Sequence, residues 1–298
     1  MTRRRLVDVA PLIDYESVTA PELLSPTPAE MLTSTLSHRG LVYAAVPGWR
    51  PLRLDLHLPA ATAGRPWPVV VYVHGGSFVG GVREMGPWTS LPAEGIAVAS
   101  ISYRLAAEAS FPEPVEDVRA AVRWVRRNAR KFDLDPGRVS LWGSSAGALL
   151  SGIAAVSGDT PLGRTVGDGT VPTHVRSVIS HYGLSDASAL VADAMAGGEA
   201  AADSLAEIIE LFTGTAATPV SVAAHIADGV RPRYLLVHGD TDTRVGHGQS
   251  VRLHRALTFA RFESDLSIVP GAGHGTAEFA DEVRTELAIA FLRESWKE

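Results

Sequence analysis

The sequence predicts an α/β fold in which one mostly parallel central sheet has helices on both faces. Strand-like and helix-like segments alternate from about residue 40 onward in a chain of 298 residues. Residues 69–73 form a continuous apolar run, which is typical of a strand buried on both faces. A chain of this length fits one α/β domain. We therefore expect a single domain over residues 41–298, preceded by an N-terminal arm over residues 1–40 that forms a cap or a pocket wall.

The strands are predicted from two patterns. Residues 52–58 alternate strictly between apolar and polar side chains, which indicates a half-buried strand. The remaining predicted strands are short apolar runs at 69–73, 96–103, 139–142, 178–182, 234–237 and 266–269.

A helical pattern lies at residues 115–132. Apolar side chains recur there at alternating gaps of three and four residues, from Val115 to Phe132, and Pro114 lies near the start. Further helices are predicted at 146–156, 247–260 and 276–295, and residues 158–173 are expected to form a loop.

One segment, residues 184–228, departs from this alternation. It begins with an alanine-rich stretch that carries Asp193, Glu199 and Asp203, and short helical patterns follow. We interpret it as an insertion above the sheet edge that forms a lid or a pocket wall. Its composition differs from the bulky apolar surface that binding to a lipid interface requires.

Composition excludes several classes of function. The formal net charge of −6 disfavours binding to nucleic-acid phosphates, and the absence of cysteine excludes thiolate metal sites and cysteine nucleophiles. No stretch approaches about 18 uncharged apolar residues, and acidic residues and prolines interrupt any signal-peptide pattern at the N-terminus. We expect a soluble cytoplasmic protein that binds neither membrane nor nucleic acid.

The strongest chemical signal is Gly143-Ser144-Ser145-Ala146-Gly147. It matches G-x-S-x-G, follows a predicted strand and opens a predicted helix, which is the context of a nucleophile elbow. Gly143 and Gly147 allow the strand and helix to pack closely. Ser145 would then lie at a helix N-terminus, where negative charge is favoured.

A serine nucleophile needs a base and an acid, and in this fold they follow in the order acid, then histidine. Asp240 and Asp242 follow the strand at 234–237, and His274 follows the last strand within a glycine-rich turn. All of these positions lie after strands, at the edge of a parallel sheet where ligands bind. The spacing alone leaves Asp240 and Asp242 as alternatives.

A glycine pair offers hydrogen-bond donors for the negative charge that develops during acyl transfer. His74-Gly75-Gly76-Ser77-Phe78 directly follows the strand at 69–73. The backbone amides of Gly75 and Gly76, together with the amide of Ala146, could form an oxyanion hole.

A metal site is the weaker alternative for the histidine and aspartate cluster. It would use His238, Asp240, Asp242 and His247, but no metal-binding motif such as H-x-H or HExxH supports it. We therefore expect no metal and no cofactor.

Six motifs occur in order along the chain: HGGSF at 74–78, Tyr103-Arg104-Leu105 with Phe111-Pro112 downstream, Asp135-Pro136-Gly137-Arg138-Val139, GSSAG at 143–147, HGDTD at 238–242 and GAGHG at 271–275. Together they resemble the α/β-hydrolase fold and, within it, the bacterial esterase/lipase branch related to hormone-sensitive lipase and acetyl-xylan-type esterases. The resemblance covers about residues 50–295.

The resemblance implies roles for particular residues. It points to the second aspartate of HGDTD, Asp242, as the acid of the triad, and to Arg104 and Asp117 as a supporting pair. The chain departs from the family where Ser77 replaces the third glycine of a longer HGGG motif, which leaves two or three amides for the oxyanion hole.

The expected function is hydrolysis of small or short-chain carboxylic esters through an acyl-enzyme on Ser145, with His274 and Asp242 completing the triad. The partner would be a small-molecule ester, and the protein a monomer or homodimer. The same triad could instead hydrolyse lactones, amides or formamides, or catalyse a biosynthetic acyl transfer or cyclisation. A non-catalytic binding protein is disfavoured because all three triad members are present.

Overall fold

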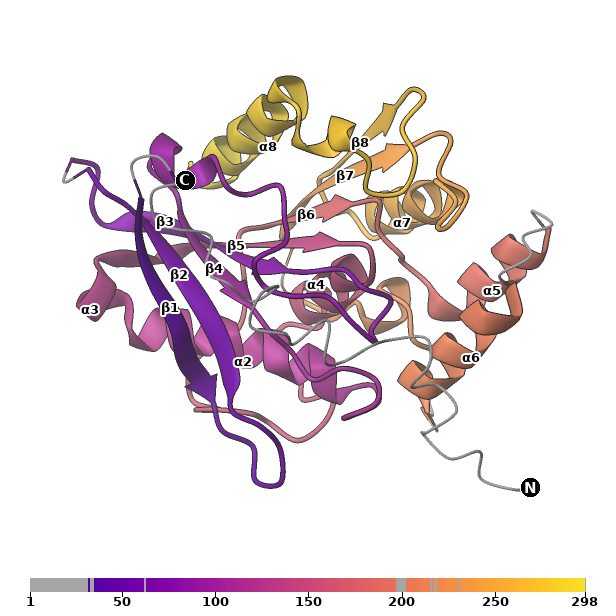
Figure 1. Ribbon diagram of the computed structural model, residues 1–298, viewed down its shortest axis with the longest axis horizontal. Coiled ribbons are helices and arrows are strands. Elements are labelled where there is room, and N and C mark those ends of the chain that lie inside the picture. The colour runs from indigo at the N-terminus through magenta and orange to yellow at the C-terminus, as the bar shows by residue number, and fades with distance from the viewer. Residues whose placement is uncertain are drawn as a thin grey trace.

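The computed structural model describes residues 35–61, 63–196, 202–214, 219–229 and 231–297, together with Leu32 and Ala216. Its strands are β1 (Thr35–Ala44), β2 (Leu52–Pro59), β3 (Trp67–Val73), β4 (Ala97–Ile101), β5 (Leu134–Ser144), β6 (Ser177–His181), β7 (Arg233–Gly239) and β8 (Ser264–Val269). They form one sheet in the order β1-β2-β4-β3-β5-β6-β7-β8 (Figure 1). β2 pairs antiparallel with β1 and with β4, and the other pairings are parallel. The predicted α/β fold with a mostly parallel sheet is confirmed.

Helices cover both faces of the sheet. The α-helices are α2 (Glu113–Arg127), α3 (Ala129–Phe132), α4 (Ala146–Val156), α5 (Ala187–Ala196), α6 (Ala202–Thr213), α7 (Gly248–Phe259) and α8 (Glu282–Ser295), and the 3-10 helices are η4 (Leu91–Glu94), η5 (Ala223–His225) and η6 (Ala277–Ala280). None of the helices in the described ranges is long and apolar enough to cross a membrane.

The core has two parts, one on each side of the sheet, and β3 contributes to both. Val69, Val71 and Val73 pack into the cluster that contains apolar residues of α2, α4 and α7. Val70 and Tyr72 pack into the cluster that contains residues of η4 and α8. Since successive side chains of a strand point to opposite faces, this division explains why residues 69–73 are apolar throughout.

Some element boundaries differ from the prediction for local reasons. The pattern at 115–132 is divided between α2 and α3 at Asn128, whose side-chain amide donates to the Trp124 carbonyl (2.8 Å). The helix predicted at 276–295 begins at Glu282, after η6, because Asp281 caps it by accepting the Arg284 amide (2.8 Å).

The first strand was not predicted. β1 begins at Thr35, so residues 35–40 of the predicted arm belong to the sheet, and most of the remaining arm lies outside the described residues. Its register with β2 is interrupted between His38 and Leu41 and again between Val42 and Ala44. These irregularities break the two-residue period by which a strand is recognised in a sequence.

Helices α5 and α6 lie within the segment 184–228 and pack against each other beside the main body (Figure 1). Their contacts with the rest of the domain include an ion pair and a stacked pair of aromatic rings. Arg252 of α7 forms an ion pair with Asp193 of α5 (3.1 Å), and Phe212 of α6 stacks on Phe78, with the ring centroids 3.8 Å apart. Phe78 follows β3, so α6 contacts the loop that was predicted to hold the oxyanion. Glu199 lies outside the described residues.

Candidate active site

Ser145 lies at the sharp turn between β5 and α4. Its backbone has φ 54° and ψ −120°, a conformation that non-glycine residues rarely adopt. A side chain is excluded on both sides of the turn: a Cβ atom on Gly143 would lie 2.3 Å from the Gly147 carbonyl oxygen, and one on Gly147 would lie 2.2 Å from the Val73 carbonyl oxygen. The two glycines therefore permit the close packing that a nucleophile elbow requires.

The structure brings Ser145, His274 and Asp242 into one hydrogen-bonded chain. Ser145 Oγ lies 2.9 Å from His274 Nε2, and His274 Nδ1 lies 2.7 Å from Asp242 Oδ2. A carboxylate only accepts hydrogen bonds, so Nδ1 carries the proton and the bare Nε2 of a neutral ring accepts from the Ser145 hydroxyl. This is the tautomer in which a histidine can remove the serine proton.

A second histidine holds Asp242 from the other side. His238 Nε2 lies 2.7 Å from the Val245 carbonyl oxygen and 3.2 Å from Asp242 Oδ2, and its Nδ1 lies 2.7 Å from Ser250 Oγ. Because the Val245 carbonyl can only accept, Nε2 is the protonated nitrogen and Nδ1 accepts from the Ser250 hydroxyl. His238 thus donates to the same carboxylate oxygen as His274 does.

The environment keeps Asp242 ionised. Burial raises the pKa of this carboxyl group, but hydrogen bonds from His238 and His274, the charge of a protonated His274 and the Val245 amide outweigh burial and hold the pKa well below its usual range. The other carboxylate oxygen, Oδ1, accepts from the amides of Arg244 (3.0 Å) and Val245 (2.9 Å). A buried carboxylate with four donors can stabilise positive charge on His274.

Asp240, the alternative acid, points elsewhere. It is exposed, and its Oδ1 accepts a hydrogen bond from the Gly271 amide (2.6 Å), which ties the loop after β7 to the loop after β8. Across the described ranges no group of three or more histidine, aspartate or glutamate side chains could hold a metal ion, so the alternative cluster of His238, Asp240, Asp242 and His247 is not assembled.

The glycine pair after β3 lies directly beside Ser145. A Cβ atom on Gly75 would be 3.1 Å from Ser145 Cβ, and Gly76 has φ 120°, where a Cβ atom would be 2.3 Å from the Gly80 carbonyl oxygen. Ser77 and Phe78 continue the turn with φ of 54° and 65°. Ala146 is the first residue of α4, so its amide has no acceptor within the helix. The three amides predicted for the oxyanion hole therefore belong to segments that adjoin Ser145.

Buried side chains hold this turn in place. The His74 ring stacks on Tyr103, with centroids 4.5 Å apart, and the Tyr103 hydroxyl donates to the His74 carbonyl (3.1 Å). Burial lowers the pKa of His74 to about 4, so the ring is neutral near pH 7. The predicted pair of Arg104 and Asp117 is present and buried, with Nη2 and Oδ1 2.7 Å apart.

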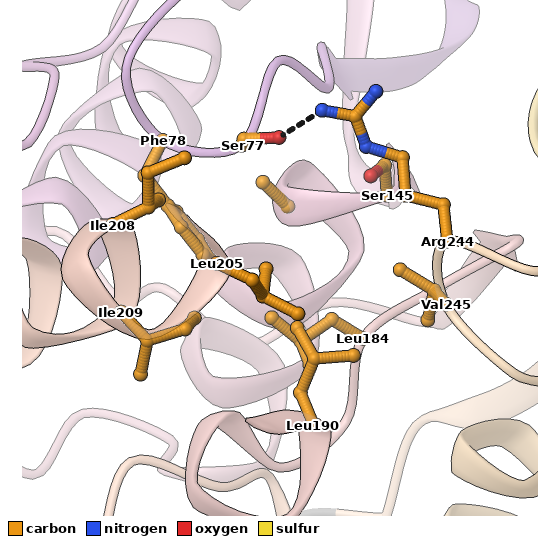
Figure 2. Close-up of a pocket in the computed structure, with 11 residues that line it drawn as sticks. Ser77, Phe78, Ser145, Leu184, Leu190, Leu205, Ile208, Ile209, Arg244 and Val245 are labelled. Atoms are coloured by element: carbon orange, nitrogen blue, oxygen red, sulfur yellow. Dashed lines mark hydrogen bonds between the residues drawn. The ribbon is translucent and has the colours of Figure 1, made fainter. Parts of the chain in front are cut away.

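A small pocket opens at Ser145, and Figure 2 shows most of its lining. We call it the Ser145 pocket; it is lined by Ser77, Phe78, Ser145, Ala146, Leu184, Leu190, Leu205, Ile208, Ile209, Arg244 and Val245. Leucine and isoleucine side chains of the segment 184–228 make most of its apolar wall. The cavity volume is about 20 Å³, roughly the space that one water molecule needs.

Sequence reasoning missed three residues at this site. His238 was considered only as a metal ligand, and Arg244 was not considered. Tyr182 directly follows β6 and packs edge-on against His274, with ring centroids 4.9 Å apart. The rule that located the other candidates, a position just after a strand of the parallel sheet, applies equally to Tyr182.

The chain is similar to known proteins in both sequence and structure. A model of the BD-FAE family matches residues 54–257. Esterase LipC of Mycobacterium tuberculosis is 28% identical over 234 residues, which cover 74% of this chain and 56% of LipC. Esterase LipQ of the same organism is 29% identical over 257 residues, covering 81% of this chain and 58% of LipQ. The chain thus spans less than two thirds of the length of these curated relatives.

Solved structures share the fold. A truncated carbohydrate esterase from gut microbiota superposes with a TM-score of 0.73 at 24% identity, covering 89% of this chain and 97% of that chain. Esterase 2 of Thermogutta terrifontis superposes with a TM-score of 0.69 at 23% identity, covering 88% of this chain and 93% of that chain.

Proposed function

Since the chain belongs to the BD-FAE family and has an α/β-hydrolase fold, we propose that it is a serine carboxylesterase acting on small or short-chain esters. The observation that carries the proposal is the continuous hydrogen-bonded chain from Ser145 through His274 to Asp242, at the mouth of a pocket. The names of the sequence relatives, among them esterases LipC and LipQ, support the same class of reaction.

The reaction proceeds in two acyl-transfer steps. Ser145 Oγ attacks the ester carbonyl carbon while its proton passes to His274 Nε2. The tetrahedral intermediate then collapses: the bond to the leaving oxygen breaks, and that oxygen takes the proton from His274. Water, deprotonated by the same nitrogen, attacks the acyl-enzyme and releases the carboxylic acid and free Ser145.

Two features of the site lower the barrier to these steps. The amides of Gly75, Gly76 and Ala146 hydrogen-bond the carbonyl oxygen as it becomes negative, and each such donor typically contributes a factor of about 10² to 10³ in kcat. Asp242 stabilises the imidazolium that forms on His274 and keeps its ring in the required tautomer.

The size of the Ser145 pocket supports a preference for short chains. Its cavity volume is only about 20 Å³, so a long acyl chain would require movement of α6. Ile208 of α6 lines the wall, so Ile208→Ala should enlarge the pocket and move the preferred chain length upward. The measurement is kcat/KM across 4-nitrophenyl esters from acetate to decanoate, and an unchanged profile would place the acyl chain elsewhere.

The deciding experiment compares the wild-type protein with Ser145→Ala on the same ester series, together with labelling by a fluorophosphonate. Hydrolysis that peaks at short chains and disappears in the variant is the expected result. Labelling of Ser145 without hydrolysis of any ester would contradict ester hydrolysis and direct the search to lactones, amides and acyl transfer. Wild-type-like turnover by folded Ser145→Ala would refute the assignment of Ser145 as the nucleophile.

A further inference from the structure

The Ser145 pocket contains a cationic group that ester hydrolysis itself does not require. Arg244 is the one charged side chain among the described residues that line the pocket. Figure 2 shows it extending from the loop after β7 toward Ser77, close to Ser145, while the leucine and isoleucine side chains lie on the other side of the pocket. The site therefore has an apolar part and a cationic part, and Ser145 lines the same pocket.

Arg244 is held in position at both ends. Its backbone amide donates to Asp242 Oδ1 (3.0 Å), as does the amide of the next residue, so the loop is anchored to the buried carboxylate. At the other end, Nη2 donates to Ser77 Oγ (3.1 Å). Ser77 lies in the turn after β3, so its hydroxyl links this turn to the loop after β7. The guanidinium group is thereby placed at the pocket that Ser145 lines before substrate binds.

The charge of Arg244 is not neutralised within the described part of the chain. No ion pair of Arg244 is found there, whereas Arg252, on the following helix, pairs with Asp193. The nearest carboxylate in sequence, Asp242, is committed to His274, His238 and two backbone amides. A guanidinium has five N–H donors, and Ser77 accepts from one of them.

We infer that Arg244 binds a carboxylate of the substrate, so that the preferred ester has an apolar group on one side of the scissile bond and a carboxylate on the other. This inference rests on the proposed function. A guanidinium presents parallel N–H groups that match the two oxygens of a carboxylate, which is why arginine is used for this recognition. A charge-assisted contact of this kind corresponds to roughly a 10- to 100-fold gain in kcat/KM.

The test uses two pairs of acetyl or methyl esters that differ in charge. For charge on the alcohol side, 4-acetoxybenzoate is compared with 4-acetoxybenzamide; for charge on the acyl side, monomethyl adipate is compared with methyl hexanoate. The enzymes are the wild type, Arg244→Gln, Arg244→Lys and the control Arg255→Gln. Arg255 is exposed on α7 and does not line the pocket, so this control makes the same change of net charge.

We expect the wild type to favour the anionic member of one pair, and that pair identifies the side of the ester that carries the charge. Arg244→Gln should lower the anionic-to-neutral ratio of kcat/KM by about 10- to 100-fold, Arg244→Lys should lower it less, and Arg255→Gln should leave it unchanged. Dividing the anionic-to-neutral ratio of each variant by that of the wild type cancels the difference in intrinsic reactivity between the two esters.

Two results would overturn the inference. One is a wild type with no anionic preference in either pair. The other is an Arg244→Gln variant that changes both members of a pair alike, as expected if the arginine only obstructs the pocket mouth. Failure of the proposed function looks different, because neither the neutral nor the anionic esters would then be hydrolysed, whether or not Ser145 reacts with the fluorophosphonate.

Discussion

Replacing Asp242 by asparagine should remove most of the proposed esterase activity, because the amide cannot satisfy the four donors around this side chain. Oδ2 accepts from His274 Nδ1 and His238 Nε2, and Oδ1 accepts from the amides of Arg244 and Val245. Asparagine has one oxygen and one NH₂ group. In either orientation the NH₂ group faces two N–H donors.

The magnitude follows from this count. Two hydrogen bonds to a charged group are lost, each of which contributes about 1.5–3 kcal/mol, so the free energy of unfolding should fall by about 3–6 kcal/mol. If the NH₂ group faces His274, the proton must move from Nδ1 to Nε2. Nε2 then points a proton at Ser145 Oγ and cannot act as a base, and such a change of tautomer costs roughly 10⁴ in kcat.

Asp240→Asn is the matched control, two residues away and with the same chemical change. Its side chain accepts a hydrogen bond from the Gly271 amide, and the oxygen of an asparagine can still accept that hydrogen bond. We expect kcat within about threefold of wild type and a free energy of unfolding within about 0.5 kcal/mol of it. Steady-state hydrolysis of 4-nitrophenyl acetate and urea unfolding measure both quantities. A larger loss of activity in Asp240→Asn than in Asp242→Asn would refute the reasoning.

Three further predictions concern the nucleophile and its surroundings. Ser145→Ala should lower kcat on the order of 10⁶-fold without unfolding the protein, as seen by kinetics and circular dichroism. Gly147→Ala should lower the free energy of unfolding, measured in urea, by about 3 kcal/mol or more, because its Cβ atom would lie 2.2 Å from the Val73 carbonyl oxygen. The control Gly248→Ala places its Cβ atom in open space and should lower the free energy of unfolding by less than about 0.5 kcal/mol. Equal losses in the two variants would contradict the packing argument. Burial lowers the pKa of His181 to about 3. Below pH 6.5 the unfolded state therefore binds a proton that the folded state does not, and the free energy of unfolding decreases as the pH is lowered. His181→Phe should therefore reduce the loss of unfolding free energy between pH 7 and 4.5 by about 2–3 kcal/mol, and an unchanged loss would show that this ring does not contribute.

Sequence reasoning failed where contacts distant in the chain override a local pattern. β1 escaped prediction because it is an edge strand whose register with β2 is irregular, so its apolar residues do not alternate. The helical pattern at 115–132 continues smoothly across Asn128, yet the backbone turns there because this side chain bonds the Trp124 carbonyl. Neither feature can be recognised from the spacing of apolar residues in the sequence.

By itself the sequence determined the parallel sheet and the edge of it that carries the site. Continuous apolar runs require strands buried on both faces, and the carboxyl ends of parallel strands meet at one edge, which places Ser145, Asp242 and His274 together. Only the tertiary structure decided which aspartate contacts His274 and which side chains surround Ser145. Asp240 and Asp242 are two residues apart on one loop, and the course of that loop turns one carboxylate to Gly271 and the other to His274. The contact of Arg244 with Ser77 joins residues 167 positions apart, and such a contact depends on how loops from different strands meet, which no local pattern encodes.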